Sequence, residues 1–158
     1  MEWLRYAVYY LPDGGLGDTG AAWLGWDARA GREVGRPEIP GLPLDAAALT
    51  ERPRRYGFHA TIKPPFRLAA ERDARGLLDA FDAICRRRGP ARAGGLSVGA
   101  IGPFLALLPE GGPEPLSALA AEVVADVDAF RAPATAAEIA RRRAAGLSPR
   151  QDRLLTRW

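Results

Sequence analysis

Cysteine, histidine, lysine and methionine are nearly absent, because the 158 residues contain one of each. A single cysteine, Cys85, excludes an intrachain disulfide and a cysteine-based metal cluster. No apolar run approaches the roughly 20 residues that span a bilayer, and the first five residues do not lead into a signal-peptide core. We therefore expect a cytoplasmic protein with no membrane partner.

The composition is that of an ordinary globular protein, with 47% hydrophobic and 26% charged residues. A chain of this length fits one domain, so residues 1–158 are interpreted as a single domain. The net charge of +3 permits anionic ligands but is too small to indicate nucleic-acid binding by itself. Cys85 follows Leu77, Phe81 and Ile84 at helical spacing, which predicts a buried structural thiol.

Strand and helix signals alternate along the chain and predict an α+β layer architecture. A helix through Ala21–Trp26 is expected to start at a cap formed by Asp18 or Thr19. The other expected elements are strands at 4–11, 56–66, 96–101 and 104–108, a long loop at 31–53 with one short helix at 45–49, and helices at 69–88, 113–130, 135–145 and from 148 onward. The last two strands are separated by Gly102-Pro103 and form two strands or a bent hairpin.

The candidate chemistry lies in the segment 57–63. Side chains alternate across a strand, which places three apolar residues on one face and three polar residues on the other: Phe58, Ala60 and Ile62 against His59, Thr61 and Lys63. Residues two apart on a strand are separated by about 6.6 Å, so an imidazole and a hydroxyl can meet one phosphate-sized anion. Imidazole exchanges a proton near neutral pH, and a threonine hydroxyl can donate to a phosphoryl oxygen. The spacing alone also fits a hydrogen-bonded structural histidine.

Longer segments carry a family resemblance. The strings RYAVYY, RRYGFHATIKPPF, GPFLALLP and FRAPATAAEIARRRAAGLSPRQDRLL together resemble the 2H phosphoesterase superfamily, and in particular its branch of uncharacterised proteins associated with phosphonate-metabolism gene clusters. The resemblance implies a bilobal, RNA-ligase-like fold of antiparallel sheet lobes flanked by helices. Each lobe donates one His-x-Thr or His-x-Ser motif to a central cleft, without metal or other cofactor.

The mechanism implied by the resemblance uses two histidines, one as general base and one as general acid. The hydroxyls hold the phosphate of a cyclic phosphodiester, of an RNA end or of another small phosphorylated substrate. Carried onto this sequence, His59 is one member of the acid–base pair and Thr61 is a phosphate-binding hydroxyl. Tyr56 and Lys63 are substrate-binding candidates because they lie close by in the sequence.

The sequence departs from this pattern because His59 is its sole histidine. We therefore expect a truncated member in which the second lobe is incomplete, and which hydrolyses 2′,3′-cyclic nucleotides very poorly. Two copies of His59 across a symmetric dimer could restore the pair. A different interpretation is a non-catalytic module that holds RNA or a phosphorylated ligand through Thr61, Lys63 and nearby arginines.

The segment Gly15–Gly20 offers a competing motif, because it matches the Gly-x-Gly-x-x-Gly fingerprint of dinucleotide-binding proteins between a strand and a helix. That fingerprint requires a second parallel strand with an acidic residue at its end. Glu38 is near the required distance, but Pro37 and Pro40 beside it are incompatible with a central strand. A glycine-rich turn followed by a helix is the favoured interpretation.

Overall fold

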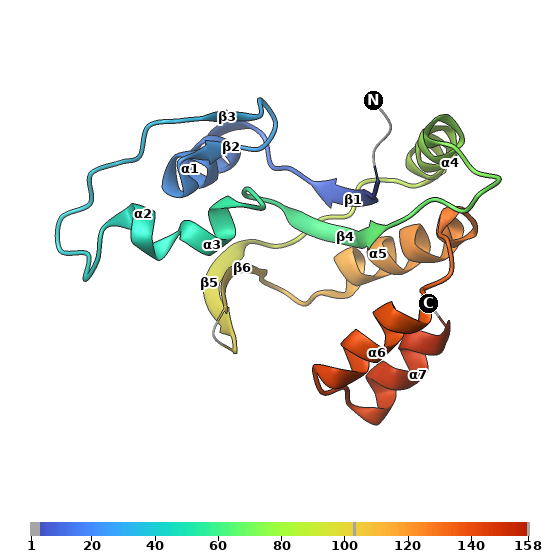
Figure 1. Cartoon of the computed structure of the whole chain (residues 1–158). Coiled ribbons are helices and arrows are strands. Elements are labelled where there is room, and N and C mark those ends of the chain that lie inside the picture. Colours follow the sequence, from blue (N-terminus) through green and yellow to red (C-terminus); the bar gives the residue numbers. More distant parts are fainter. Residues whose placement is uncertain (1–3, 103, 158) are drawn as a thin grey trace. The chain divides into compact units, whose positions relative to one another are not determined.

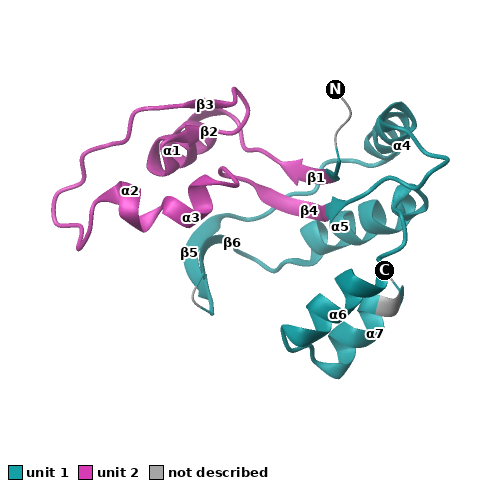
Figure 2. Ribbon diagram, viewed as in Figure 1, with its two compact units in different colours: residues 1–6, 65–158 teal, residues 7–64 magenta. Residues whose placement is uncertain are grey.

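The computed structural model describes residues 4–102 and 104–157 and contains helices and small antiparallel sheets, which confirms the predicted α+β class (Figure 1). The chain forms two compact units (Figure 2). Unit 1 comprises Met1–Tyr6 and Pro65–Trp158, and unit 2 comprises Ala7–Pro64. Pro103, which was expected to separate two strands, and the first three residues, which entered the signal-peptide analysis, lie outside the described residues.

Unit 2 contains most of the predicted motif segment. Its elements are β1 (Tyr6–Tyr10), α1 (Gly14–Leu24), β2 (Trp26–Asp27), β3 (Arg32–Glu33), α2 (Ala46–Leu49), α3 (Glu51–Arg54) and β4 (Ala60–Phe66), with the ends of β1 and β4 reaching into unit 1. Strand β1 pairs with β4, and the two arrows run in opposite directions in Figure 1. The predicted short helix after Asp45 is confirmed as α2, whereas α3 and the β2–β3 pair were not predicted.

Helix α1 begins earlier than expected, and the predicted cap at Asp18 or Thr19 is wrong. It starts at Gly14, with Asp13 as N-cap residue, so all of the glycine-rich motif is helical. Glycine is normally unfavourable inside a helix, but here close packing requires it. A Cβ on Gly17 would lie 2.2 Å from the Pro12 carbonyl oxygen, and one on Gly20 would lie 2.1 Å from the ring of Phe58.

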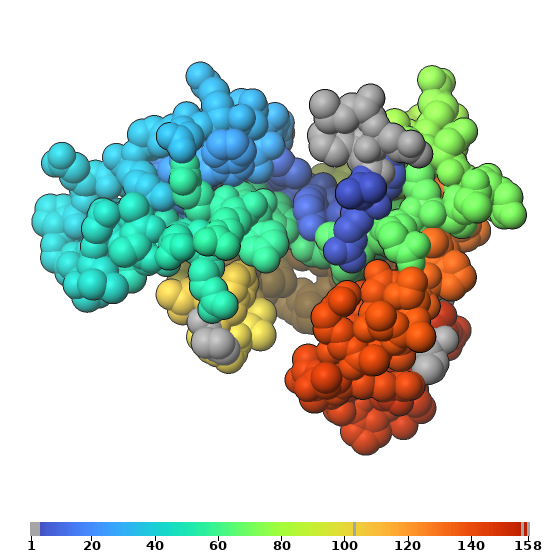
Figure 3. Space-filling view, in the orientation of Figure 1, coloured from blue at the N-terminus to red at the C-terminus, as the bar shows by residue number. Residues whose placement is uncertain are grey.

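Unit 1 contains the remaining elements: α4 (Ala74–Arg87), β5 (Leu96–Ile101), β6 (Phe104–Pro109), α5 (Glu114–Asp126), the 3-10 helix η1 (Asp128–Phe130), α6 (Ala136–Ala144) and α7 (Pro149–Arg157). Strands β5 and β6 form an antiparallel hairpin whose register runs from Leu96 opposite Pro109 to Ile101 opposite Phe104. The hairpin alternative predicted from the sequence is therefore confirmed. Its first strand is the yellow surface in Figure 3.

The apolar core of unit 1 includes residues of α4 and of the α5–η1 segment. Leu77 and Ile84 on α4 and Val123 and Val127 on the α5 side are each at most 7% exposed. The predicted burial of Cys85 is wrong, because this thiol is exposed. It lies seven residues after Leu78, which is 63% exposed, so both occupy the solvent side of the helix. No helix among the described residues is both long and apolar enough to cross a membrane.

The start of α6 is fixed by a capping box, as its hydroxyl cap predicted. The Thr135 hydroxyl accepts a hydrogen bond from the Glu138 amide, and the Glu138 carboxylate accepts one from the Thr135 amide at 2.8 Å. Arg67 also donates to this carboxylate, at 3.2 Å. The Thr135 amide first, and then Arg67 and the Thr135 hydroxyl, lower the pKa of Glu138 to about 2 from its ordinary value of 4.5.

This carboxylate makes the stability of unit 1 depend on pH. A pKa that is lower in the folded than in the unfolded chain stabilises the fold above pH 4.5, and this contribution disappears as the pH falls toward about 2. We expect the wild type to be more stable than Glu138→Gln near neutral pH, because glutamine retains the capping acceptor but not the charge. Denaturant unfolding of both proteins between these pH values should show the difference shrinking. A constant difference would contradict the assignment.

Candidate functional site

The predicted site is built on the turn between α3 and β4 in unit 2. The amide of Gly57 donates to the carbonyl oxygens of Pro53 and Arg54, which closes the end of α3. Gly57 has a φ of +74°, a left-handed conformation that favours glycine. The chain then extends through His59, just before β4, and Thr61 is the second residue of that strand.

His59 and Thr61 meet as predicted. The Nε2 atom of His59 lies 3.3 Å from the Thr61 hydroxyl oxygen, and Nδ1 lies 2.9 Å from the Gly57 carbonyl oxygen. A carbonyl can only accept, so Nδ1 carries the proton when the ring is neutral. Nε2 then has a free lone pair that accepts from the Thr61 hydroxyl. The backbone thereby orients the imidazole with its basic nitrogen toward the threonine, as general base catalysis requires.

An aromatic ring that the sequence did not single out supports the imidazole. The ring centroids of Tyr9, on β1, and His59 are 4.3 Å apart with an interplanar angle of 43°. This contact follows from the pairing of β1 with β4, which joins segments about fifty residues apart. His59 is half-buried, whereas Thr61 is exposed and Tyr9 is 37% exposed. A ligand can therefore reach Nε2 and the hydroxyl from solvent on unit 2.

The other two predicted site residues depart from the expected open polar face. Lys63 is only 3% exposed, and Ala60, expected on the apolar face, is exposed. The simple alternation of a core face and a solvent face is therefore wrong here. Tyr56 is 71% exposed, on the turn before Gly57. Contact of Lys63 or Tyr56 with a substrate stays a prediction.

The β2–β3 turn packs against the turn that holds His59. A Cβ on Gly57 would lie 2.4 Å from the Cβ of Ala28. The position of Ala28 is fixed by Asp27, whose carboxylate accepts hydrogen bonds from the amides of Arg29 and Ala30. The Ala30 amide is the main cause that lowers the pKa of Asp27. Gly57, whose carbonyl orients His59, thus lies between Ala28 and the end of α3, to which its amide is bonded.

The competing dinucleotide interpretation has no structural support. Helix α1 is followed by the short antiparallel β2–β3 pair, not by a parallel strand that would complete a nucleotide-binding unit. Over the described ranges, 4–102 and 104–157, no group of three or more His, Cys, Asp or Glu side chains is placed to hold a metal ion. The chemistry available at this site is proton transfer by His59 and hydrogen bonding by Thr61.

In a comparison with known protein families, the matched region begins within the segment that carries the candidate site. A family model described as "Protein of unknown function (DUF1045)" matches residues 61–158, so that Thr61 is its first residue and His59 lies just before it. No solved structure matches the chain.

Two curated relatives match almost the whole chain, and both are named Ribose 1,5-bisphosphate phosphokinase PhnN. The protein from Janthinobacterium sp. (strain Marseille) is 39% identical over 157 residues, which cover 98% of this chain and 35% of the relative. The protein from Laribacter hongkongensis (strain HLHK9) is 33% identical over 157 residues, covering 98% of this chain and 36% of the relative. The chain thus spans about a third of the length of these relatives.

Proposed function

The chain belongs to the DUF1045 family, and from this premise we propose that it carries a 2H-type phosphoesterase half-site that acts on a cyclic phosphodiester or a phosphorylated metabolite of phosphonate metabolism. The observation that carries the proposal is the pair formed by His59 and Thr61, with Nε2 3.3 Å from the hydroxyl. The resemblance to the phosphonate-associated 2H branch supports the reaction class. The PhnN-named relatives support the metabolic setting.

The proposed step is metal-independent hydrolysis of a phosphodiester. Nε2 of His59 takes a proton from the attacking water, the water oxygen forms a bond to phosphorus, and the bond from phosphorus to one ribose oxygen breaks. The leaving oxygen receives a proton from solvent water, because His59 is the sole histidine of this chain and already acts as the base. The Thr61 hydroxyl turns from Nε2 to donate a hydrogen bond to a phosphoryl oxygen, whose negative charge grows in the transition state.

The reaction needs one proton transfer from the water and one to the leaving oxygen. An imidazole of this chain can perform only one of them, because His59 is its sole histidine. A second imidazole has to come from outside these 158 residues. The proposal therefore predicts slow hydrolysis by this polypeptide alone, and it makes His59 and Thr61 responsible for binding and for one of the two proton transfers.

The kinase activity in the names of the relatives is not proposed for this chain. A P-loop kinase would hold the phosphates of a nucleotide with the sequence Gly-x4-Gly-Lys-Ser/Thr. The sole lysine, Lys63, is followed by Pro64 and lies on β4. The 98% of the chain that aligns covers only about a third of each relative, so most of each relative's length has no counterpart in these 158 residues.

Hydrolysis of 2′,3′-cyclic AMP tests the proposal. The wild type is compared with His59→Ala and with Leu44→Ala, a control at a side chain that is 60% exposed in the same unit. Slow hydrolysis that requires His59 and is unaffected by the control supports the proposal. Hydrolysis that survives His59→Ala, or a rate equal to that of a two-histidine enzyme, refutes it.

A further inference from the structure

A second candidate site lies wholly within unit 1 and is rich in arginine. Four guanidinium groups and one carboxylate line a cavity of about 50 Å³: Arg5, Arg67, Arg131, Arg142 and Glu138. The four arginines come from the N-terminal segment, the end of β4, the residue after η1 and helix α6. Chain segments far apart in the sequence thus bring like charges together around one space.

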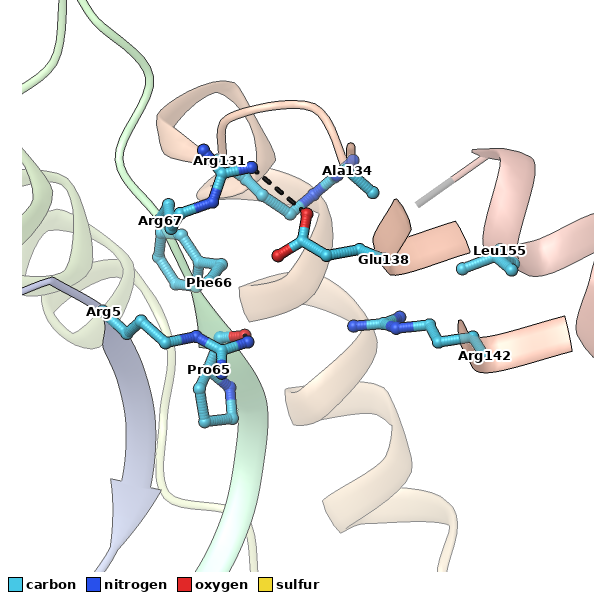
Figure 4. Close-up of a pocket in the computed structure, with 9 residues that line it drawn as sticks. All are labelled: Arg5, Pro65, Phe66, Arg67, Arg131, Ala134, Glu138, Arg142 and Leu155. Atoms are coloured by element: carbon cyan, nitrogen blue, oxygen red, sulfur yellow. Dashed lines mark hydrogen bonds and ion pairs between the residues drawn. The ribbon is translucent and has the colours of Figure 1, made fainter. Parts of the chain in front are cut away.

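Two of these positive charges have no carboxylate partner within residues 4–102 and 104–157. Arg67 is paired with Glu138 at 3.2 Å, and Arg131 is paired with Asp128 at 2.7 Å. In the part of the chain that the structure describes, Arg5 donates to a backbone carbonyl, that of Pro65, at 3.4 Å. The guanidinium group of Arg142 has no hydrogen-bond or ion-pair partner within the described part of the chain; its backbone carbonyl accepts only the helical bond from Ala145. Figure 4 shows the guanidinium groups of Arg5 and Arg142 pointing toward each other from opposite sides of the cavity.

Like charges that face one space repel each other, and an anion bound between the two groups would relieve this repulsion. Among the described residues, the guanidinium groups of Arg5 and Arg142 leave a charge of +2, which matches a phosphate dianion. Planar guanidinium groups bind phosphate oxygens with two parallel hydrogen bonds, and they do so better than lysine. The cavity of about 50 Å³ exceeds the roughly 10–15 Å³ that holds one water. Phe66, which is 5% exposed, and Leu155 provide apolar walls.

We propose that the cavity lined by Arg5, Arg67, Arg131 and Arg142 is a binding site for a dianionic phosphoryl group, either inorganic phosphate or the phosphate monoester of a small metabolite. The site is separate from the His59–Thr61 pair, since all of its lining residues belong to unit 1. It provides no nucleophile or proton-transfer group for the bound phosphate, so its role is binding. Except for Arg5, its residues fall in the region matched by the family model.

Calorimetric titration of the full chain with inorganic phosphate, at mildly alkaline pH and low salt, tests the proposal. Arg142→Gln should weaken the affinity at least about 10-fold, because a charge-assisted hydrogen bond is lost. The matched control is Arg141→Gln, which removes the same charge from an exposed neighbour outside the cavity and should change the affinity less than about 2-fold. Both positions are exposed on α6, so glutamine preserves the helix.

Two further variants separate this site from other sources of binding. Glu138→Gln should tighten phosphate binding several-fold, because it removes the competing carboxylate and keeps the capping acceptor. The phosphate binding that Arg142→Gln weakens should persist in His59→Ala. The same variants are also titrated with ribose 5-phosphate. If it binds more tightly than inorganic phosphate, the ligand is a phosphate monoester; if it binds less tightly, the ligand is the free ion. Absence of phosphate binding, equal effects of Arg141→Gln and Arg142→Gln, or loss of binding in His59→Ala alone would overturn the proposal.

Discussion

We expect His59→Ala to lower the rate of 2′,3′-cyclic AMP hydrolysis at least about 100-fold, since a positioned general base contributes roughly 10²–10⁴-fold. The wild-type rate itself should lie below that of a two-histidine enzyme by a similar factor, because one of the two proton transfers has no imidazole. The reaction is followed by separating the 2′- and 3′-monophosphate products. Leu44→Ala should retain the wild-type rate.

Free imidazole gives this prediction a second readout. If the chain provides only one of the two proton-transfer groups, added imidazole should accelerate the wild type in proportion to its concentration by acting as the missing partner. It should also partly rescue His59→Ala, because the small side chain leaves space beside Thr61. A wild-type rate that is insensitive to imidazole but still requires His59 would show that another residue is the second acid or base.

The second large effect is expected at Gly57. We expect Gly57→Ala to destabilise the chain by about 2–4 kcal/mol, which combines a left-handed alanine with overpacking against Ala28. Gly57 has a φ of +74°, and the added Cβ would lie 2.4 Å from the Cβ of Ala28. The variant should also lose hydrolysis, because the same residue's carbonyl holds Nδ1 of His59. Denaturant unfolding measures the free-energy change.

The matched control for this substitution is Gly31→Ala in the same unit. Gly31 has a φ of +64°, and a Cβ placed on it meets no atom within 4 Å. Gly31→Ala should therefore lower the free energy of unfolding only by the cost of a left-handed alanine backbone, which is about 1–2 kcal/mol. If Gly57→Ala costs no more than Gly31→Ala, the contact between the β2–β3 turn and the histidine turn does not hold the site.

Local signals in the sequence predicted several elements well. Thr135, followed three residues later by Glu138, forms the capping box that starts α6. Gly102-Pro103 separates two apolar runs that pair as the β5–β6 hairpin. The meeting of His59 and Thr61 followed from the two-residue period of an extended chain. In each case the relevant residues lie within a few positions of each other, so local geometry decides the outcome.

Tertiary packing decided the features that the sequence did not predict. The start of α1 was misplaced because helix propensity alone disfavours glycine, whereas Gly20 packs closely against Phe58, 38 residues later, and Gly17 against the Pro12 carbonyl. Cys85 was expected in the core, yet the buried stripe of α4 runs through Leu77 and Ile84 and leaves Cys85 outside it. Lys63 was expected to be exposed but is buried.

Contacts between residues that are far apart in the sequence could not be predicted, because no local pattern marks them. Tyr9 reaches His59 only through the pairing of β1 with β4. The cavity in unit 1 collects Arg5, Arg67, Arg131 and Arg142 from four segments of an arginine-rich chain. With so many arginines in the sequence, nothing marks these four before the fold is known.

Nuclear magnetic resonance of the imidazole of His59 tests the central claim most directly, because the sole histidine gives an unambiguous signal. In the neutral form of the ring, the ¹⁵N shifts should place the proton on Nδ1, bonded to the Gly57 carbonyl. Addition of 2′,3′-cyclic AMP should shift Nε2 strongly in the wild type and much less in Thr61→Val. A ring protonated at Nε2 that does not respond to the nucleotide would contradict the assignment of His59 and Thr61 as a phosphoesterase half-site.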